Sequence, residues 1–164
     1  MNKPKIAILG ASGIGKFHAR EFHNAGCEIA AILGSTEQTV AKTAELLLKE
    51  FRIKTKPYHK LDALLKEELD AVSICTPPSL HSLHVKKSLE NNLHVLCEKP
   101  FILDLKSDNY HIAKDLINMA NKKNKLLSVN TQWPSIVPIL KTYIKKDIEK
   151  FYAQMDVVGI NGTN

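Results

Sequence analysis

Residues 5–15 read KIAILGASGIG, a short apolar run followed directly by a turn of small residues. The run 5–9 is typical of a strand, and the segment after the turn places Ile14, Phe17 and Phe22 near one face of a helix. A strand that leads through a glycine turn into a helix begins a βαβ unit, from which parallel sheets are built. This stretch therefore predicts an α/β fold.

The following residues, as far as 130, repeat this alternation of short apolar runs and helical patterns. Further strands are predicted at 27–33, 54–56, 71–75, 93–97 and 126–129, and helices at 36–51, 61–66, 80–91 and 107–121. Six strands joined by helical crossovers predict a doubly wound parallel sheet of the Rossmann type over residues 1–130.

Residues 131–164 have a different pattern. A helix is expected at 135–150, and 151–159 alternates between apolar and polar side chains like a strand with one face in water. Such a strand suits an antiparallel sheet. The pattern predicts the start of a second, α+β domain that this chain does not complete.

Four residues mark expected boundaries. Gly26 is predicted to end the first helix, and Pro57 to end the third strand. Ser35 is predicted to cap the second helix, with Gln38 completing a capping box. Ser79 is predicted to cap the helix that follows the fourth strand.

Composition excludes several classes of protein. The net charge of +6 comes from 23 Lys and Arg against 17 Asp and Glu, but the lysines are scattered and few aromatics lie among them. This distribution favours solvated helix faces over a nucleic-acid surface. No apolar run approaches the roughly 18 residues that cross a membrane. Three cysteines, Cys27, Cys75 and Cys97, form no CxxC pair and indicate a reduced, cytoplasmic protein.

The turn after the first strand has the composition of a phosphate-binding loop. Small residues there let the chain turn sharply and bring backbone N–H groups close to a pyrophosphate, at the positive end of the next helix. Ser12 stands where a second glycine is usual, and its hydroxyl can still donate to phosphate. The alternative is an unliganded strand-to-helix turn. The expected contacts are Gly10, Ser12, Gly13, Ile14 and Gly15.

The end of the second strand bears on which dinucleotide is bound. NAD sites usually carry an acid here for the ribose hydroxyls. In this chain no acid precedes Glu37, which suits the first turn of a helix. Ser35 and Thr36 could donate to a 2′-phosphate, so NADP is favoured and NAD stays open. Ser35 can serve as cap, as ligand, or as both.

Two further motifs follow later strands. Residues 76–81 read TPPSLH after the fourth strand, and 97–100 read CEKP after the fifth. Together with the glycine turn, these motifs resemble the Gfo/Idh/MocA oxidoreductase family over residues 5–135. The EKP tripeptide is the most specific of the three, and their order strengthens the resemblance.

The resemblance implies a two-domain NAD(P)-dependent dehydrogenase or reductase that acts on a sugar, polyol or related small molecule, and it leaves a homo-oligomer open. It also implies a cis bond before Pro100. Lys99 would assist the proton transfer that accompanies hydride transfer. The further residues placed at the cofactor by the resemblance are Thr76, Pro77, His81, Glu98, Lys99 and Gln132.

Lys99 also has a physical reading independent of the family. A lysine at the carboxyl edge of a parallel sheet points toward the crevice where ligands bind, and partial burial suits a lysine to proton chemistry. The alternative is a surface lysine in a loop. His81 and His84 lie one helical turn apart, yet no further ligand completes a metal set, so no metal is expected.

Two functional hypotheses remain. The first is an oxidoreductase represented by its cofactor domain and the start of its substrate domain, which would leave this chain alone catalytically incomplete. The second is a non-catalytic NAD(P)-binding module, either a sensor or a decayed relative.

Overall fold

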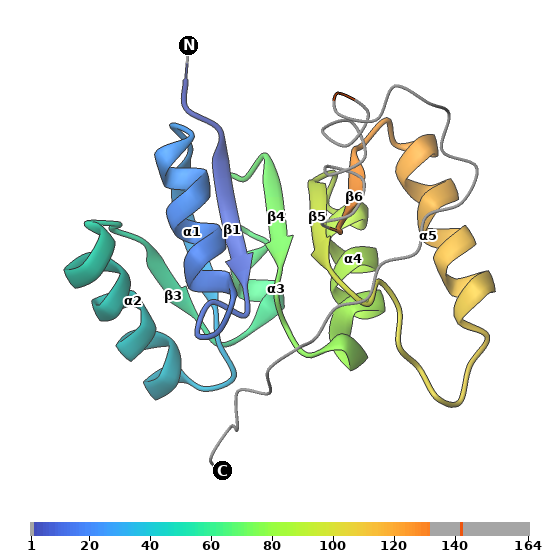
Figure 1. Cartoon of the computed structure of the whole chain (residues 1–164), viewed down its shortest axis with the longest axis horizontal. Helices are drawn as coiled ribbons and strands as arrows, with labels where there is room; N and C mark the ends of the chain where they lie inside the picture. Colours follow the sequence, from blue (N-terminus) through green and yellow to red (C-terminus); the bar gives the residue numbers. More distant parts are fainter. Residues whose placement is uncertain (1, 132–141, 143–164) are drawn as a thin grey trace. The chain divides into compact units, whose positions relative to one another are not determined.

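A parallel six-stranded sheet forms the centre of the computed structural model, which describes residues 2–131 and 142 (Figure 1). The strands lie in the order β3-β2-β1-β4-β5-β6, and every neighbouring pair is parallel. This order reverses between β1 and β4, so the predicted doubly wound Rossmann-type sheet is confirmed. The strands are β1 Lys5–Leu9, β2 Glu28–Leu33, β3 Lys56–Tyr58, β4 Ala71–Ile74, β5 His94–Glu98 and β6 Leu127–Asn130.

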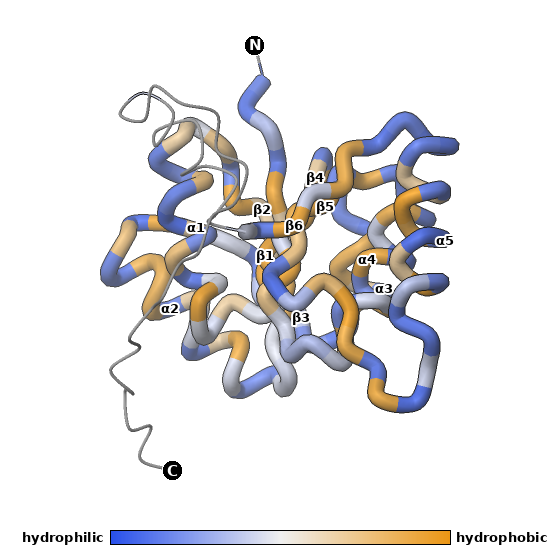
Figure 2. Tube along the Cα trace, turned by 45° about the vertical axis from the view of Figure 1, so that its right-hand side comes forward, coloured by the Kyte–Doolittle hydropathy of each residue, from blue (hydrophilic) through white to orange (hydrophobic). Residues whose placement is uncertain are grey.

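Helices cover both faces of the sheet, and each strand divides its side chains between them. Ile6 and Ile8 of β1 pack with α1 and α2, whereas Ala7 and Leu9 belong to the core under α3, α4 and α5. Apolar colour gathers along the central strands in Figure 2, while the helices alternate between apolar and polar. The helices are α1 Gly15–Asn24, α2 Glu37–Phe51, α3 Leu61–Leu64, α4 His81–Glu90 and α5 Asn109–Lys122.

The third strand corrects one prediction. Pro57 does not end it, because β3 runs through this residue as Lys56–Tyr58. The strand lies at the edge of the sheet and pairs only with β2, and an edge strand tolerates a proline because one side needs no N–H donor. The other strands begin or end within one residue of their predicted bounds.

Two predicted helix caps are also wrong. Thr36, not Ser35, caps α2, and Thr39, not Gln38, closes the capping box. The N–H of Gly34 donates to the carbonyl of Tyr58 on β3 at 2.9 Å, and α2 begins at Glu37, one residue later than predicted. Ser79 lies inside a short 3-10 helix, Pro78–Leu80, and α4 starts without a side-chain cap. Gly26 does end the first helix region, with φ of 89°.

By its contacts the chain divides into Met1–Thr131 and Gln132–Asn164. The helix expected at 135–150 and the strand expected at 151–159 lie outside the described residues. The incomplete second domain therefore stays a prediction.

Candidate functional site at the carboxyl edge of the sheet

Three loops meet where the strand order reverses. The N–H of Gly10, just after β1, donates to the carbonyl of Leu33 at the end of β2 at 2.9 Å. The N–H of Cys75, just after β4, donates to the carbonyl of Leu9 at 2.7 Å. These bonds hold the loops after β1, β2 and β4 side by side at the switch point, which is where open α/β sheets bind ligands.

Glycine is required at two positions of the first loop. Gly10 has φ of 89°, and a Cβ there would lie 2.7 Å from the backbone carbonyl of Cys75 and from the N of Thr76. A Cβ at Gly15 would strike the carbonyl oxygen of Gly10. Gly13 differs, because a Cβ there meets nothing within 4 Å. The turn is packed tightly on the protein side and open on the other, as a loop that cradles a phosphate requires.

A groove of about 640 Å³ opens beside this turn. It brings together six residues that the sequence assigned to cofactor binding, from the loops after β1, β2 and β4. These are Gly10, Ser12, Gly13, Ser35, Thr76 and Pro77.

The remaining predicted residues take other places. Ile14 and Gly15 complete the turn, and Thr36 caps α2. Glu98 is the last residue of β5 and Lys99 follows it, and neither belongs to the lining of the groove. Gln132 lies outside the described residues.

The start of α1 favours an anionic ligand. Its N-cap residue, Ile14, makes no side-chain capping bond, and the first turn carries no acidic residue. The first N–H groups of a helix have no partner within the helix, and the helix dipole adds partial positive charge. A diphosphate therefore fits this end of the groove in both charge and hydrogen bonding.

Sequence reasoning missed two histidines in the groove, His59 and His84. His84 is 6% exposed, and its Nδ1 lies 3.0 Å from the hydroxyl oxygen of Thr76. Burial, and to a lesser extent the neighbouring His81, lowers the pKa of His84. Its imidazole is thus neutral near pH 7 and fixes the Thr76 hydroxyl. His59 directly follows β3, a position that the strand predicted at 54–56 did not reveal.

His81 is fully buried. Its Nδ1 lies 2.8 Å from the carbonyl oxygen of Pro100, and its Nε2 lies 2.8 Å from that of Thr76. The side chain therefore bridges the loops after β4 and β5 and is turned away from solvent. Its predicted place at the border of the cofactor groove stays a prediction.

The EKP segment ends β5. The bond between Lys99 and Pro100 is cis, as the family resemblance implies, and the Lys99 residue is exposed. The Glu98 side chain is 12% exposed and receives hydrogen bonds from His18 and Asn130. From sequence, His18 reads as a packing or surface residue. Its position on α1, one turn after Gly15, is the signal that could have placed it against the sheet.

The cysteines offer no nucleophile here. Burial raises the pKa of both Cys75 and Cys97 to about 12, so both stay protonated thiols near neutral pH. Among residues 2–131 and 142, no group of three or more His, Cys, Asp or Glu side chains is placed to hold a metal ion. No helix in this part of the chain is long and apolar enough to cross a membrane.

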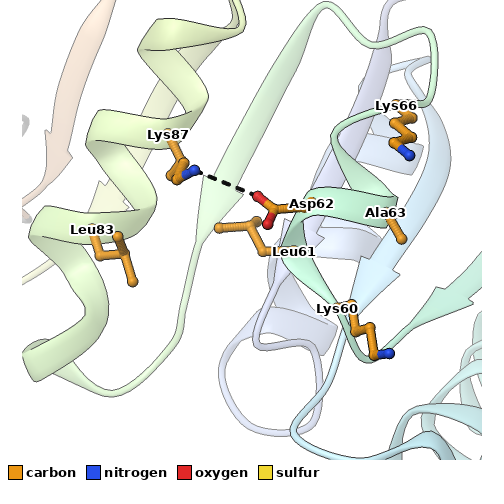
Figure 3. Close-up of a pocket in the computed structure, with 7 residues that line it drawn as sticks. All are labelled: Lys60, Leu61, Asp62, Ala63, Lys66, Leu83 and Lys87. Carbon is orange, nitrogen blue, oxygen red and sulfur yellow. Dashed lines mark ion pairs between the residues drawn. The ribbon is translucent and has the colours of Figure 1, made fainter.

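A second hollow of about 550 Å³ lies between α3 and α4 (Figure 3). It shares Leu61 with the groove, and Lys87 and Asp62 form an ion pair across it at 3.6 Å. Both charged side chains are largely solvated, so the pair contributes little. With neither a glycine turn nor a buried polar group in its lining, this hollow lacks the features that single out the groove at the switch point.

The strand order, the glycine turn and the groove at the switch point together define a Rossmann fold with a ligand site at its carboxyl edge. The chain belongs to the Gfo/Idh/MocA family, described as an oxidoreductase family with an NAD-binding Rossmann fold, whose sequence profile matches residues 4–131.

Several relatives are sugar or polyol dehydrogenases. UDP-N-acetylglucosamine 3-dehydrogenase of Acidithiobacillus ferrooxidans is 30% identical over 125 residues, covering 76% of this chain and 36% of the relative. Glucose-6-phosphate 3-dehydrogenase of Bacillus subtilis is 28% identical over 85% of this chain and 37% of its own length.

Solved structures of other proteins share this fold. A structure of the A. ferrooxidans enzyme superposes with a TM-score of 0.64 at 31% identity, over 79% of this chain and 38% of that one. Biliverdin reductase from Synechocystis, solved with biliverdin and NADP+, gives a TM-score of 0.65 at 28% identity, over 76% of this chain and 37% of that one. The chain thus spans less than two fifths of the length of these relatives.

Proposed function

We propose that this chain binds NADP or NAD and forms the cofactor-binding part of a dehydrogenase or reductase for a sugar, polyol or related small molecule. The single observation that carries the proposal is the groove at the switch point. One side of its glycine turn is tightly packed against the protein, and the open side lines the groove just before the uncapped start of α1. When bound, the nicotinamide would exchange a hydride with a secondary alcohol or carbonyl carbon of the substrate.

The residues of the groove would hold the two ends of the cofactor differently. Gly10, Ser12 and Gly13 would approach the diphosphate through backbone N–H groups and one hydroxyl. Ser35 would face the adenosine ribose, while the hydroxyl of Thr36 beside it caps α2, and no carboxylate precedes Glu37 to repel a 2′-phosphate. This favours NADP, with NAD as the second candidate.

Lys99 would move the proton. Its residue is exposed at the end of β5, the same edge of the sheet as the glycine turn. A lysine ammonium there can donate to a carbonyl oxygen of the substrate as hydride arrives, and the amine can accept the proton in the reverse direction. The class of substrate is inferred from relatives named as dehydrogenases of UDP-N-acetylglucosamine, glucose 6-phosphate and inositol.

Fluorescence titration with NADPH and NADH tests cofactor binding. We expect both to bind and NADPH to bind more tightly, and failure of both would refute the proposal. Lys99→Met should leave both affinities within about twofold, since its role is in chemistry rather than binding. Lys54→Met, another exposed lysine, is the matched control. A large loss of affinity in Lys99→Met alone would make Lys99 a binding residue.

A second experiment separates the oxidoreductase from a non-catalytic binding module. The chain is incubated with NADP or NAD and a panel of nucleotide sugars, sugar phosphates and inositols, and formation of reduced nicotinamide is followed. Turnover that disappears in Lys99→Met supports catalysis. Cofactor binding without turnover on any of the panel favours the module for this chain by itself.

A further inference from the structure

A hydrogen-bonded cluster joins four elements on the α1 side of the sheet. His18 of α1 places Nδ1 2.8 Å from Ser73 Oγ on β4 and Nε2 3.0 Å from Glu98 Oε1 on β5. Asn130, the last residue of β6, donates from Nδ2 to the same Glu98 oxygen. These groups are 55 to 112 residues from His18 along the chain, so the cluster exists only when the sheet is assembled.

The chemistry of the partners sets the direction of each bond. An ionised Glu98 can only accept, so His18 donates to it from Nε2–H. When the imidazole carries only this hydrogen, Nδ1 accepts the hydroxyl hydrogen of Ser73. Ser73 is completely buried, and the side chains of His18 and Glu98 are 11% and 12% exposed. The carboxylate therefore places a ring hydrogen on Nε2, and the buried hydroxyl of Ser73 holds the orientation of the His18 ring.

The other oxygen of the carboxylate acts on the backbone of the next residue. Glu98 Oε2 accepts the N–H of Lys99 at 3.3 Å. Through this bond the carboxylate orients the backbone from which the Lys99 side chain departs. Because His18 and Asn130 both donate to Oε1, the carboxylate cannot rotate freely, and Oε2 stays close to the N–H of Lys99.

We propose that His18 is a positioning residue for the EKP segment. Held by Ser73, it fixes the Glu98 carboxylate and through it the backbone of Lys99. The inference rests on the proposed function, in which Lys99 carries the proton. His18 itself touches no substrate.

Two amide substitutions distinguish the roles of the two ring nitrogens of His18. The amide nitrogen of Gln at position 18 reaches where Nε2 lies, and that of Asn reaches only where Nδ1 lies. His18→Gln should therefore keep the bond to Glu98, and His18→Asn should lose it while filling most of the same volume. We expect NADPH affinity within about twofold of wild type for both variants, because the bond joins two protein groups and Lys99, which it positions, is not needed for binding.

A spectroscopic signature tests positioning directly. In the full chain, without cofactor, the backbone amide resonance of Lys99 should shift in His18→Asn and stay near its wild-type position in His18→Gln. His23→Ala, an exposed histidine on the same helix, is the control and should change neither reading. An equal shift of the Lys99 amide resonance in the Asn and Gln variants would overturn the proposal, because a role in packing alone does not distinguish the two nitrogens.

The outcomes separate this inference from the proposed function. If wild type binds neither cofactor but the Lys99 amide responds as expected, the proposed function fails and the positioning stands. If cofactor binds and the amide does not respond, the positioning fails alone. Should His18→Asn not fold, Glu98→Gln replaces it: the ¹⁵N signals of the His18 ring must then report a change of tautomer or a lost bond, and unchanged signals would overturn the proposal.

Discussion

The β1–α1 and β2–α2 junctions lie next to each other on one edge of the sheet, yet the helices that follow the two strands begin in opposite ways. At β2–α2, the hydroxyls of Thr36 and Thr39 each accept a backbone N–H of the other residue, and Glu37 adds an acid in the first turn. At β1–α1, Ile14 offers no cap and no acid follows. The second helix has a side-chain cap and an acid in its first turn, whereas the first helix has neither and leaves its positive end for a ligand.

The largest effect is expected from Gly10→Ala, which places a methyl group against the backbone after β4 and demands a positive φ from alanine. We expect the free energy of unfolding to fall by about 3 kcal/mol, measured by chemical denaturation. Gly13→Ala is the matched control, since its methyl group enters open space. It should change stability by less than about 1 kcal/mol but weaken cofactor binding. Equal destabilisation by the two variants would contradict the packing described for the turn.

Ile14→Asp gives the first junction the acid that the second one has. The carboxylate should weaken NADPH binding by more than about tenfold, because it opposes the diphosphate at close range. Stability should stay equal or rise by a few tenths of a kcal/mol through the helix dipole. Titration and thermal unfolding measure the two effects. Ile14→Asn separates charge from shape, and a loss of affinity as large as that of Asp would show that charge is not the cause.

Thr36→Ala removes the cap from the second junction and should cost about 1 kcal/mol of stability. Ser35→Ala, one residue earlier, should stay within about 0.5 kcal/mol of wild type. Urea denaturation of the two variants decides which hydroxyl caps α2. The reverse order of stabilities would restore the cap that the sequence predicts.

The smallest effect concerns a third junction, β4–α4, where His84 is buried against Thr76. The unfolded chain binds a proton near the ordinary histidine value of 6.5, while burial lowers the pKa of the folded group. Stability is therefore fully present above this pH and falls as the pH is lowered toward the depressed pKa. Thermal unfolding from about pH 8 to about pH 5 should show a flatter profile for His84→Asn than for wild type. His23→Asn, an exposed control, should leave the wild-type profile unchanged, and an equally steep profile in His84→Asn would refute the assignment.

Short-range sequence patterns explain why much of the carboxyl edge of the sheet could be predicted. The glycine turn, the apolar runs and Gly26 act over a few residues, and the structure confirms the strand–turn–helix order that they predict. Ser35 and Thr36 show the limit of such signals. Two neighbouring hydroxyl residues are equally good caps in sequence, and the folded backbone decides between them: Thr36 is extended, and its hydroxyl accepts the N–H of Thr39.

Sequence by itself determined the α/β class, the place of the phosphate-type turn and the motifs that mark the family, because periodicity and turn chemistry are short-range properties. Tertiary structure alone decided which distant groups meet. His18 reaches Glu98 across 80 residues, and His81 bridges Thr76 to Pro100, only because the strand order sets β1, β4 and β5 side by side. Such contacts carry no local pattern, since they arise when packing aligns the carboxyl ends of separate strands.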